Sequence, residues 1–258
     1  QTYYKDFPKK SEGIFYSAST DVAWTLEAAQ KGHEIAKRLD CPSVINMSLG
    51  NEIGAHDGSD LAAQFIKELS QDAIYCIGAS NSGGNKEHVH HTFTRNGETA
   101  KISLDNNPYC GVQFFSDNDK PFTLNYCAMG DGLVSVTLAS IREEGTLVID
   151  SENADDPLVQ KVKPYISTPN FRIEMRAGKY YNGKYFVELF ATDCLIDPDF
   201  GYFQLEIAAD KDTHIEGHIF MATGGFSWDK KPGEMVPDDN WSISSLVPGT
   251  NVICVGAM

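Results

Sequence analysis

Residues 43–84 decide the fold and read SVINMSLGNEIGAHDGSDLAAQFIKELSQDAIYCIGASNSGG. Two short apolar runs, residues 44–49 and 73–79, have the length of fully buried strands and are bounded by Gly, Pro or Asp. Between them, residues 61–69 repeat their apolar side chains at intervals of three and four, and Ser59 can cap the resulting helix. The stretch therefore predicts a strand, a crossover helix and a second, parallel strand.

The second predicted strand ends in residues 78–84, GASNSGG, at the carboxyl edge of a parallel sheet. Open α/β sheets place their ligand sites at this edge. A phosphate-binding loop would need Lys and then Ser or Thr after the second Gly of G-x-x-x-x-G, but Gly84 and Asn85 stand there. A G-x-S-x-G elbow does not occur either. The chemistry is expected at this edge, without a nucleotide site.

At these residues the sequence resembles the subtilisin-like serine peptidases. That family carries V-I-N-M-S-L-G on one strand and ends a later strand in A-A-G-N-x-G. Residues 44–50 match the first motif completely, and residues 78–83 match the second with Ser80 in place of the usual Gly. The resemblance implies that Asn81 donates a hydrogen bond to the oxyanion of acyl transfer. Without it, Asn81 is a residue favoured in tight turns.

The resemblance also implies a substrate-binding edge. In the family the S-L-G segment pairs with the substrate backbone, and Gly residues after the Asn border the specificity pocket. The residues of this chain that match are Ser48, Leu49, Gly50 and Gly83. The alternative for the glycines is a flexible exit from the strand.

The catalytic triad of the resembled family has no match in the sequence. The family uses an Asp in D-[ST]-G, a His in H-G-T-H and a Ser in G-T-S-M-A, and none of these patterns occurs. In family order they lie before the S-L-G strand and after a V-G-A strand. The expected function is therefore that of a fragment of a subtilisin-like serine endopeptidase, inactive by itself. Whether the parent is an active enzyme or a pseudopeptidase stays open.

The pattern changes after Gly84. From residue 89 to 221, short alternating runs separated by turn residues predict a β-sandwich or jelly roll. Residues 251–257, NVICVGA, again form a continuous apolar run and resemble the family strand that follows the A-G-N loop.

These patterns predict an α/β fold class with two domains. Residues 1–84 and 240–258 are expected to form a partial subtilisin-like parallel sheet with helices. Residues 85–239 are expected to form an inserted all-β sandwich. Bacterial members of the family with a jelly-roll insertion resemble this arrangement. A short strand at residues 14–16 and a helix capped by Ser19 or Thr20 are expected to precede the first motif.

A second hypothesis makes the chain a non-catalytic binding or structural module, with a protein or glycan partner for the inserted sandwich. Tyr180, Tyr181 and Trp228 are candidates for stacking on a sugar. Core or rim packing explains the same aromatic residues.

Composition and charge limit the partners. Thirty-six acidic against 21 basic residues give a formal net charge of −15, which opposes binding to nucleic acid or to an anionic membrane. The sequence contains no apolar run of the roughly 20 residues of a membrane span and no signal segment. A secreted, periplasmic or cell-surface location in a bacterium is implied by the resemblance alone. Cys76 and Cys254, in apolar runs, are expected to be buried free thiols.

No metal or cofactor is predicted. On a strand, His88 and His90 of the H-x-H-H run share a face while His91 points away, and no neighbouring carboxylate or Cys completes a set. A solvated strand end is therefore expected. Calcium is unsupported because no complete D-x-[DN]-x-[DN]-G loop occurs, and solvated turn carboxylates are expected instead. These carboxylates are Asp117, Asp119, Asp197 and Asp199.

Overall fold

The computed structural model describes residues 22–117, 120–130, 135–180, 182–221, 225–227, 233–249 and 251–256. Its strands form a three-stranded, a six-stranded and a five-stranded sheet. The predicted α/β fold class is wrong, because the described chain is mostly β and its two larger sheets are antiparallel. The helical pattern that favoured α/β is real but covers too few residues to set the class.

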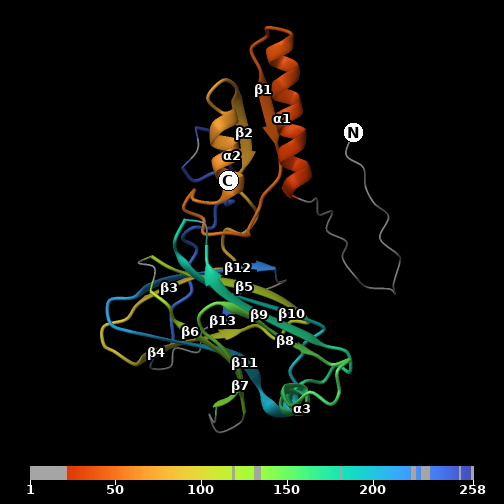
Figure 1. Ribbon diagram of the computed structural model, residues 1–258, viewed down its shortest axis with the longest axis vertical. Coiled ribbons are helices and arrows are strands. Elements are labelled where there is room, and N and C mark those ends of the chain that lie inside the picture. The colour runs from red at the N-terminus through yellow and green to blue at the C-terminus, as the bar shows by residue number, and fades with distance from the viewer. Residues whose placement is uncertain are drawn as a thin grey trace.

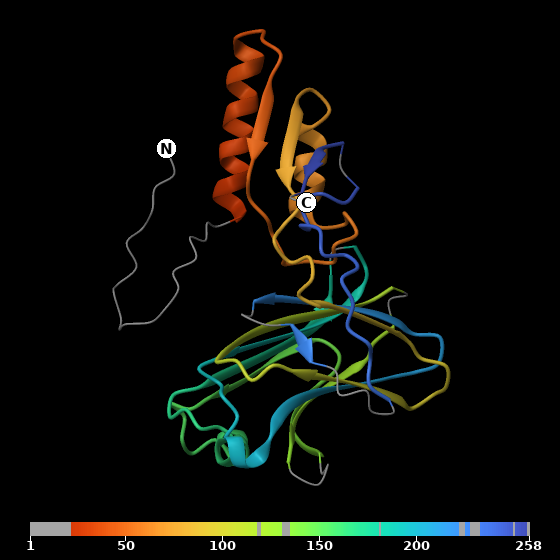
Figure 2. The same cartoon turned by 180° about the vertical axis from the view of Figure 1, so that it is seen from behind.

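The three-stranded sheet is parallel and has the order β1-β2-β14. These strands are β1 (Val44–Met47), β2 (Ile74–Gly78) and β14 (Ile253–Val255). Figures 1 and 2 show this sheet and its two long helices, α1 (Val22–Arg38) and α2 (Leu61–Leu69), at one end of the molecule. The expected pairing of the last strand with β2 is confirmed in the described residues, where Ile253 lies opposite Cys76.

One face of the parallel sheet packs against the helices. Tyr75 and Ile77 of β2 are fully buried, and they cluster with Met47, Ile66 of α2 and Ala29 of α1. Burying a side chain of this size contributes about 1.5–3 kcal/mol. The apolar period of residues 61–69 predicted this face in part, because Ile66 is buried but Leu61 is 66% exposed.

The other face of the same sheet is exposed. Val44 of β1 is 67% exposed, Ile74 of β2 is 51% exposed and Val255 of β14 is 55% exposed. Cys76 and Cys254 are free thiols, as predicted, but Cys254 of β14 is exposed and Cys76 is half-buried, so their predicted burial is wrong. Parallel sheets are normally covered on both faces, and this one presents apolar side chains to its surroundings.

The two antiparallel sheets pack face to face around a separate apolar core. The six-stranded sheet has the order β3-β12-β5-β10-β9-β8, and the five-stranded sheet has the order β13-β4-β11-β6-β7. Alternation along each strand sends one set of side chains into this core, as in β10, where every second residue is buried. The strand bounds are β3 (His88–Thr92), β4 (Glu98–Leu104), β5 (Tyr109–Ser116), β6 (Thr123–Met129), β7 (Ser135–Ile141), β8 (Gly145–Asp150), β9 (Arg172–Lys179), β10 (Tyr185–Thr192), β11 (Tyr202–Ala209), β12 (His214–Met221) and β13 (Phe226–Ser227).

Short helical segments complete the described chain. They are α3 (Pro157–Val162) and the 3-10 turns η1 (Lys163–Tyr165) and η2 (Pro198–Phe200). None of the described helices is long and apolar enough to cross a membrane. The strand expected at residues 14–16, the caps at Ser19 and Thr20, and the side chains of Asp119, Tyr181 and Trp228 lie outside the described residues.

The loop between β1 and α2 fastens the parallel sheet to the six-stranded sheet. The backbone N–H of Gly54 donates to Gln113 Oε1 of β5 at 2.8 Å, and the Tyr180 hydroxyl donates to Asp60 Oδ1 at 2.7 Å. Lys184 Nζ lies 2.7 Å from Asp57 Oδ2. These contacts hold the loop at residues 51–60 against the sandwich.

The domain boundaries, 1–84 with 240–258 and 85–239, stay a prediction.

Candidate substrate edge and histidine cluster

The loops that leave β1 and β2 run side by side, which brings most of the predicted site together. A Cβ atom added to Gly78 would lie 3.5 Å from the carbonyl oxygen of Leu49, and one added to Gly50 would lie 3.6 Å from Ser80 Cα. Ser48, Leu49 and Gly50 are all exposed. Their backbone is therefore accessible at the carboxyl end of the parallel sheet.

Asn81 lies at this edge and is exposed. It follows Ser80, whose φ of 100° is in a region that side-chain-bearing residues rarely adopt. The family motif has Gly before its Asn, and the positive φ is the physical reason a Gly suits this position. Gly83 is also exposed, and a Cβ added to it would meet nothing within 4 Å.

Hydrogen bonds of the Ser80 side chain support this unusual backbone. The Ser80 hydroxyl donates to the carboxylate of Glu52, and its oxygen accepts the backbone N–H of Ser82 at 3.2 Å. Burial raises the pKa of Glu52 and the nearby Glu87 adds to the rise, while the hydrogen bond from Ser80 opposes it. The partly buried carboxyl group of Glu52 thus contacts the loop that carries Asn81.

A small polar pocket adjoins the edge, where the strand-end loops meet the sandwich. Glu52, His56 and Ser82 line it from the loops, and His88 and His218 line it from β3 and β12. Three imidazole rings follow one another here. The rings of His56 and His218 are stacked with centroids 4.4 Å apart, and those of His218 and His88 are 4.9 Å apart.

His88 lies between two carboxylates. Its Nε2 is 2.6 Å from Glu216 Oε2 and its Nδ1 is 2.7 Å from Asp238 Oδ1, and the residue is only 2% exposed. Burial lowers the pKa of His88, but the hydrogen bonds with Glu216 and Asp238 outweigh this and raise it overall. Burial holds the pKa of His218 well below its usual range, and the neighbouring His56 and His88 lower it further. The two adjacent rings therefore have pKa values shifted in opposite directions.

The pocket does not contain a serine–histidine pair. His56 Nδ1 lies 2.8 Å from the carbonyl oxygen of Ile243, and Nε2 lies 3.0 Å from the carbonyl oxygen of Glu52. Both ring nitrogens face backbone carbonyl oxygens instead of a serine hydroxyl, so the ring is not placed to take a proton from Ser82. A nucleophilic serine needs such a base.

Several sequence-based interpretations of this region were wrong. His88 is buried, not part of a solvated strand end, and its carboxylate partners come from residues 128 and 150 positions away. His91 also has a carboxylate neighbour that the sequence did not indicate, because its Nε2 lies 3.1 Å from Glu98 Oε1. Asp117 is not simply a solvated turn carboxylate, because it contacts Lys184 and His214.

The candidate turn carboxylate Asp197 and the candidate sugar-stacking residue Tyr180 both make contacts within the fold. The Asp197 side chain accepts the backbone N–H of Asp199 at the start of η2, as a turn carboxylate should. The Tyr180 ring packs edge-on against Phe115, with centroids 5.2 Å apart. Tyr180 is therefore part of the contact between the loop and the sandwich, which weakens its case as a sugar-stacking residue.

Comparison with known proteins gives a likeness in fold. No family model matches the sequence, and no curated protein matches it. Among solved structures, the chain is similar to the CspB protease of Clostridium perfringens, with a TM-score of 0.58 and 14% sequence identity. The match covers 81% of this chain but only 42% of that protease, so the chain spans less than half of its length. At this identity the likeness concerns the fold alone.

Proposed function

We propose that the chain is the substrate-binding and oxyanion-stabilising part of a subtilisin-like serine endopeptidase. In this proposal the nucleophilic Ser, the His base and its Asp partner come from outside the 258 residues. The observation that carries the proposal is the contact between residues 48–50 and residues 78–80, which puts the exposed Asn81 beside an accessible strand edge. The fold likeness to a protease supports the same assignment.

The proposed mechanism divides the work between two parts of the parent. An extended peptide or protein substrate pairs with the backbone of residues 48–50, and Gly83 leaves room for a substrate side chain. The external Ser attacks the scissile carbonyl and the external His accepts its proton. The Asn81 amide then donates to the negative oxygen of the tetrahedral intermediate. Such a donor contributes about 10²–10³-fold to kcat.

The exposed face of the parallel sheet supports a contribution from further segments. Val44, Ile74 and Val255 present apolar side chains on that face, and burial of such surface stabilises a parallel sheet. We assign this face to segments of the parent that also bring the triad. From the family resemblance we also propose a secreted, periplasmic or cell-surface location in a bacterium for the parent, and cell fractionation tests that location.

The experiment is a comparison of two variants in the full-length parent. Asn81→Ala should lower kcat by about 10²–10³-fold with little change in KM, because the lost hydrogen bond forms in the transition state. Asn85→Ala is the matched control, since Asn85 is an exposed amide on the same loop whose Nδ2 contacts Glu87 at 3.0 Å. Unchanged turnover in Asn81→Ala would reduce Asn81 to a turn residue.

The isolated chain supplies a second test. It should remain unlabelled by a fluorophosphonate probe and leave casein intact, because without nucleophile and base no acyl-enzyme can form. Stoichiometric labelling of Ser80 or Ser82 would refute the assignment of the nucleophile to another segment. If the parent sequence lacks a triad, the non-catalytic binding role, with a protein or glycan partner for the sandwich, becomes the first choice.

A further inference from the structure

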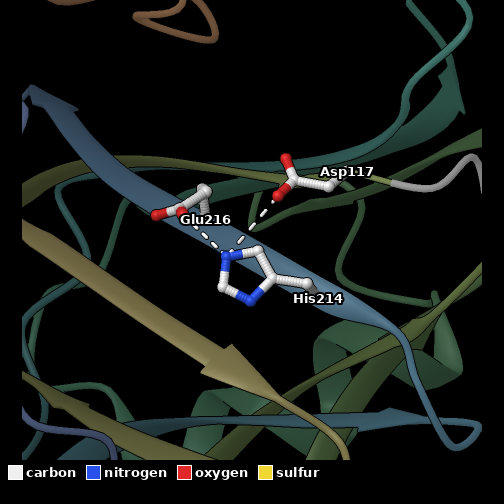
Figure 3. Close-up of side chains that lie close together, drawn as sticks. All are labelled: Asp117, His214 and Glu216. Atoms are coloured by element: carbon white, nitrogen blue, oxygen red, sulfur yellow. Dashed lines mark hydrogen bonds and ion pairs between the residues drawn. The ribbon is translucent and has the colours of Figure 1, made fainter.

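Three side chains outside the pocket converge on one point of the six-stranded sheet. His214 and Glu216 are two positions apart on β12 and therefore share a face. Asp117 directly follows β5, and its backbone N–H donates to the carbonyl oxygen of His214 at 3.0 Å, which places it across from that residue. Figure 3 shows the two carboxylates pointing toward His214 Nε2. One ligand atom from each residue lies within 4.8 Å of the others.

We propose that Asp117, His214 and Glu216 bind a divalent transition-metal ion, with Zn²⁺ as the best match. The two carboxylates offer two negative charges, which a dication balances, and the imidazole offers a nitrogen lone pair once the ion has displaced its Nε2 proton. Imidazole nitrogen suits zinc, nickel and copper, whereas calcium takes six to eight oxygen ligands and magnesium prefers oxygen and water. The mixed set of one nitrogen and two oxygens therefore favours the zinc class.

The interatomic distances suit such an ion. Zinc–nitrogen and zinc–oxygen bonds in tetrahedral geometry place two ligand atoms about 3.4 Å apart. His214 Nε2 lies 3.5 Å from Asp117 Oδ2, close to this value. It lies 2.7 Å from Glu216 Oε1, a hydrogen-bond distance that must open by roughly 0.7 Å when the ion replaces the proton. The Asp117 side chain is 44% exposed, so solvent can supply a fourth ligand.

A second observation is that two of the three ligands, His214 and Glu216, are each oriented through their other polar atom. His214 Nδ1 lies 2.7 Å from the hydroxyl oxygen of Thr92. A hydrogen bond donated by Nδ1 holds the tautomer in which Nε2, once its proton has left, presents a lone pair to the ion. Glu216 Oε2 accepts from His88 Nε2 at 2.6 Å, which leaves Oε1 for the ion. Outer partners of this kind are typical of metal ligands, and losing one costs about 10–100-fold in affinity.

Lys184 pairs with the third ligand, Asp117, and competes with the ion for it. Its Nζ lies 3.2 Å from Asp117 Oδ1 and 2.7 Å from Asp57 Oδ2. A bound dication next to this ammonium group is repelled by it, while the ammonium group keeps Asp57 as a partner. Removing the Lys184 charge should therefore tighten metal binding, an effect opposite to that of a general loss of structure.

The test is calorimetric titration of the untagged 258-residue chain with Zn²⁺, Ca²⁺ and Mg²⁺. We expect one equivalent of Zn²⁺ to bind and to raise the Tm, because the ion joins β5 to β12, and we expect no comparable response to Ca²⁺ or Mg²⁺. His214→Ala should abolish this binding. Thr92→Val, which keeps the shape of the side chain, should weaken it about 10–100-fold. Lys184→Gln should strengthen it.

The matched control is His91→Gln. His91 lies on β3 next to Thr92, and its Nε2 faces Glu98 at 3.1 Å, away from the proposed ligands. This variant should bind Zn²⁺ as the unmodified chain does. Circular dichroism shows whether each variant is folded. The proposal is overturned if Zn²⁺ does not bind, or if folded His214→Ala and Thr92→Val bind it with unchanged affinity.

Discussion

At Ser80, substitution by Gly should leave the protein more stable than substitution by Ala, which reverses the usual order. In most positions Ala is more stable than Gly by about 0.5–1 kcal/mol, because Gly loses more backbone freedom on folding. At Ser80 the backbone φ is 100°. A residue with a Cβ atom in left-handed backbone geometry costs about 1–2 kcal/mol, and Gly avoids this cost. Ser80→Gly should therefore be more stable than Ser80→Ala.

The magnitude follows from the two opposing effects. Both variants lose the hydroxyl that donates to Glu52 and accepts from Ser82, which costs about 1.5–3 kcal/mol where the acceptor is charged. Relative to Ser80→Ala, Ser80→Gly is stabilised by about 1–2 kcal/mol because it avoids the backbone strain. It is destabilised by about 0.5–1 kcal/mol because Gly loses more backbone entropy on folding. The expected difference lies between about 0 and 1.5 kcal/mol, with a midpoint of about 0.75 kcal/mol in favour of Gly.

Urea unfolding of the 258-residue chain measures this difference. The midpoint of Ser80→Gly should lie above that of Ser80→Ala at equal m-values. Ser82 supplies the control, because it belongs to the same loop and is not among the residues with positive φ. There the Ala variant should be the more stable one. An Ala variant at position 80 that equals or exceeds the Gly variant would refute the argument from backbone strain.

Three further predictions concern packing, titration and thiol reactivity. Gly217→Ala should destabilise the chain by about 1–3 kcal/mol, because its Cβ would lie 2.3 Å from a Phe114 ring carbon, while Gly83→Ala, which meets nothing within 4 Å, should change the free energy of unfolding little. Burial raises the pKa of Glu52 from 4.5, so stability should be lost as the pH rises from 4.5 through the raised value; Glu52→Gln should remove this loss in urea titrations at several pH values. Burial raises the pKa of Cys110 to about 12, so a thiol reagent at mildly alkaline pH should leave it unmodified in the folded chain while labelling the exposed Cys254, as peptide mass mapping can show.

The local elements could be predicted because their signals are local. The apolar period of residues 61–69 matches α2 at both ends, and the runs at 44–49 and 73–79 contain β1 and β2. The cap was predicted less well. Asp60, not Ser59, is the N-cap residue, and its side chain makes no capping hydrogen bond. Instead Asp60 accepts from Tyr180, a partner 120 residues away that no local pattern reveals.

The fold class failed for a different reason. The α/β class was inferred from the S-L-G and A-S-N segments, whose loops lie side by side at the end of the parallel sheet. Two short motifs say little about the rest of a chain, and the alternating runs between residues 88 and 227 build two antiparallel sheets that outweigh the parallel one. Alternation predicts that a strand has two faces, but it does not say which strands pair.

The same distinction explains why the histidine cluster was missed. The alternation of His214, Glu216 and His218 on β12 could have identified three polar residues on one face of a strand. It could not have shown that His88 lies opposite His218, because that register is set by pairing between strands about 130 residues apart in the chain. A search for metal or acid–base sites in a β-rich sequence should therefore compare whole faces of predicted strands. In this chain such a comparison would pair His88 with Glu216, which are in contact although they lie 128 residues apart in the sequence.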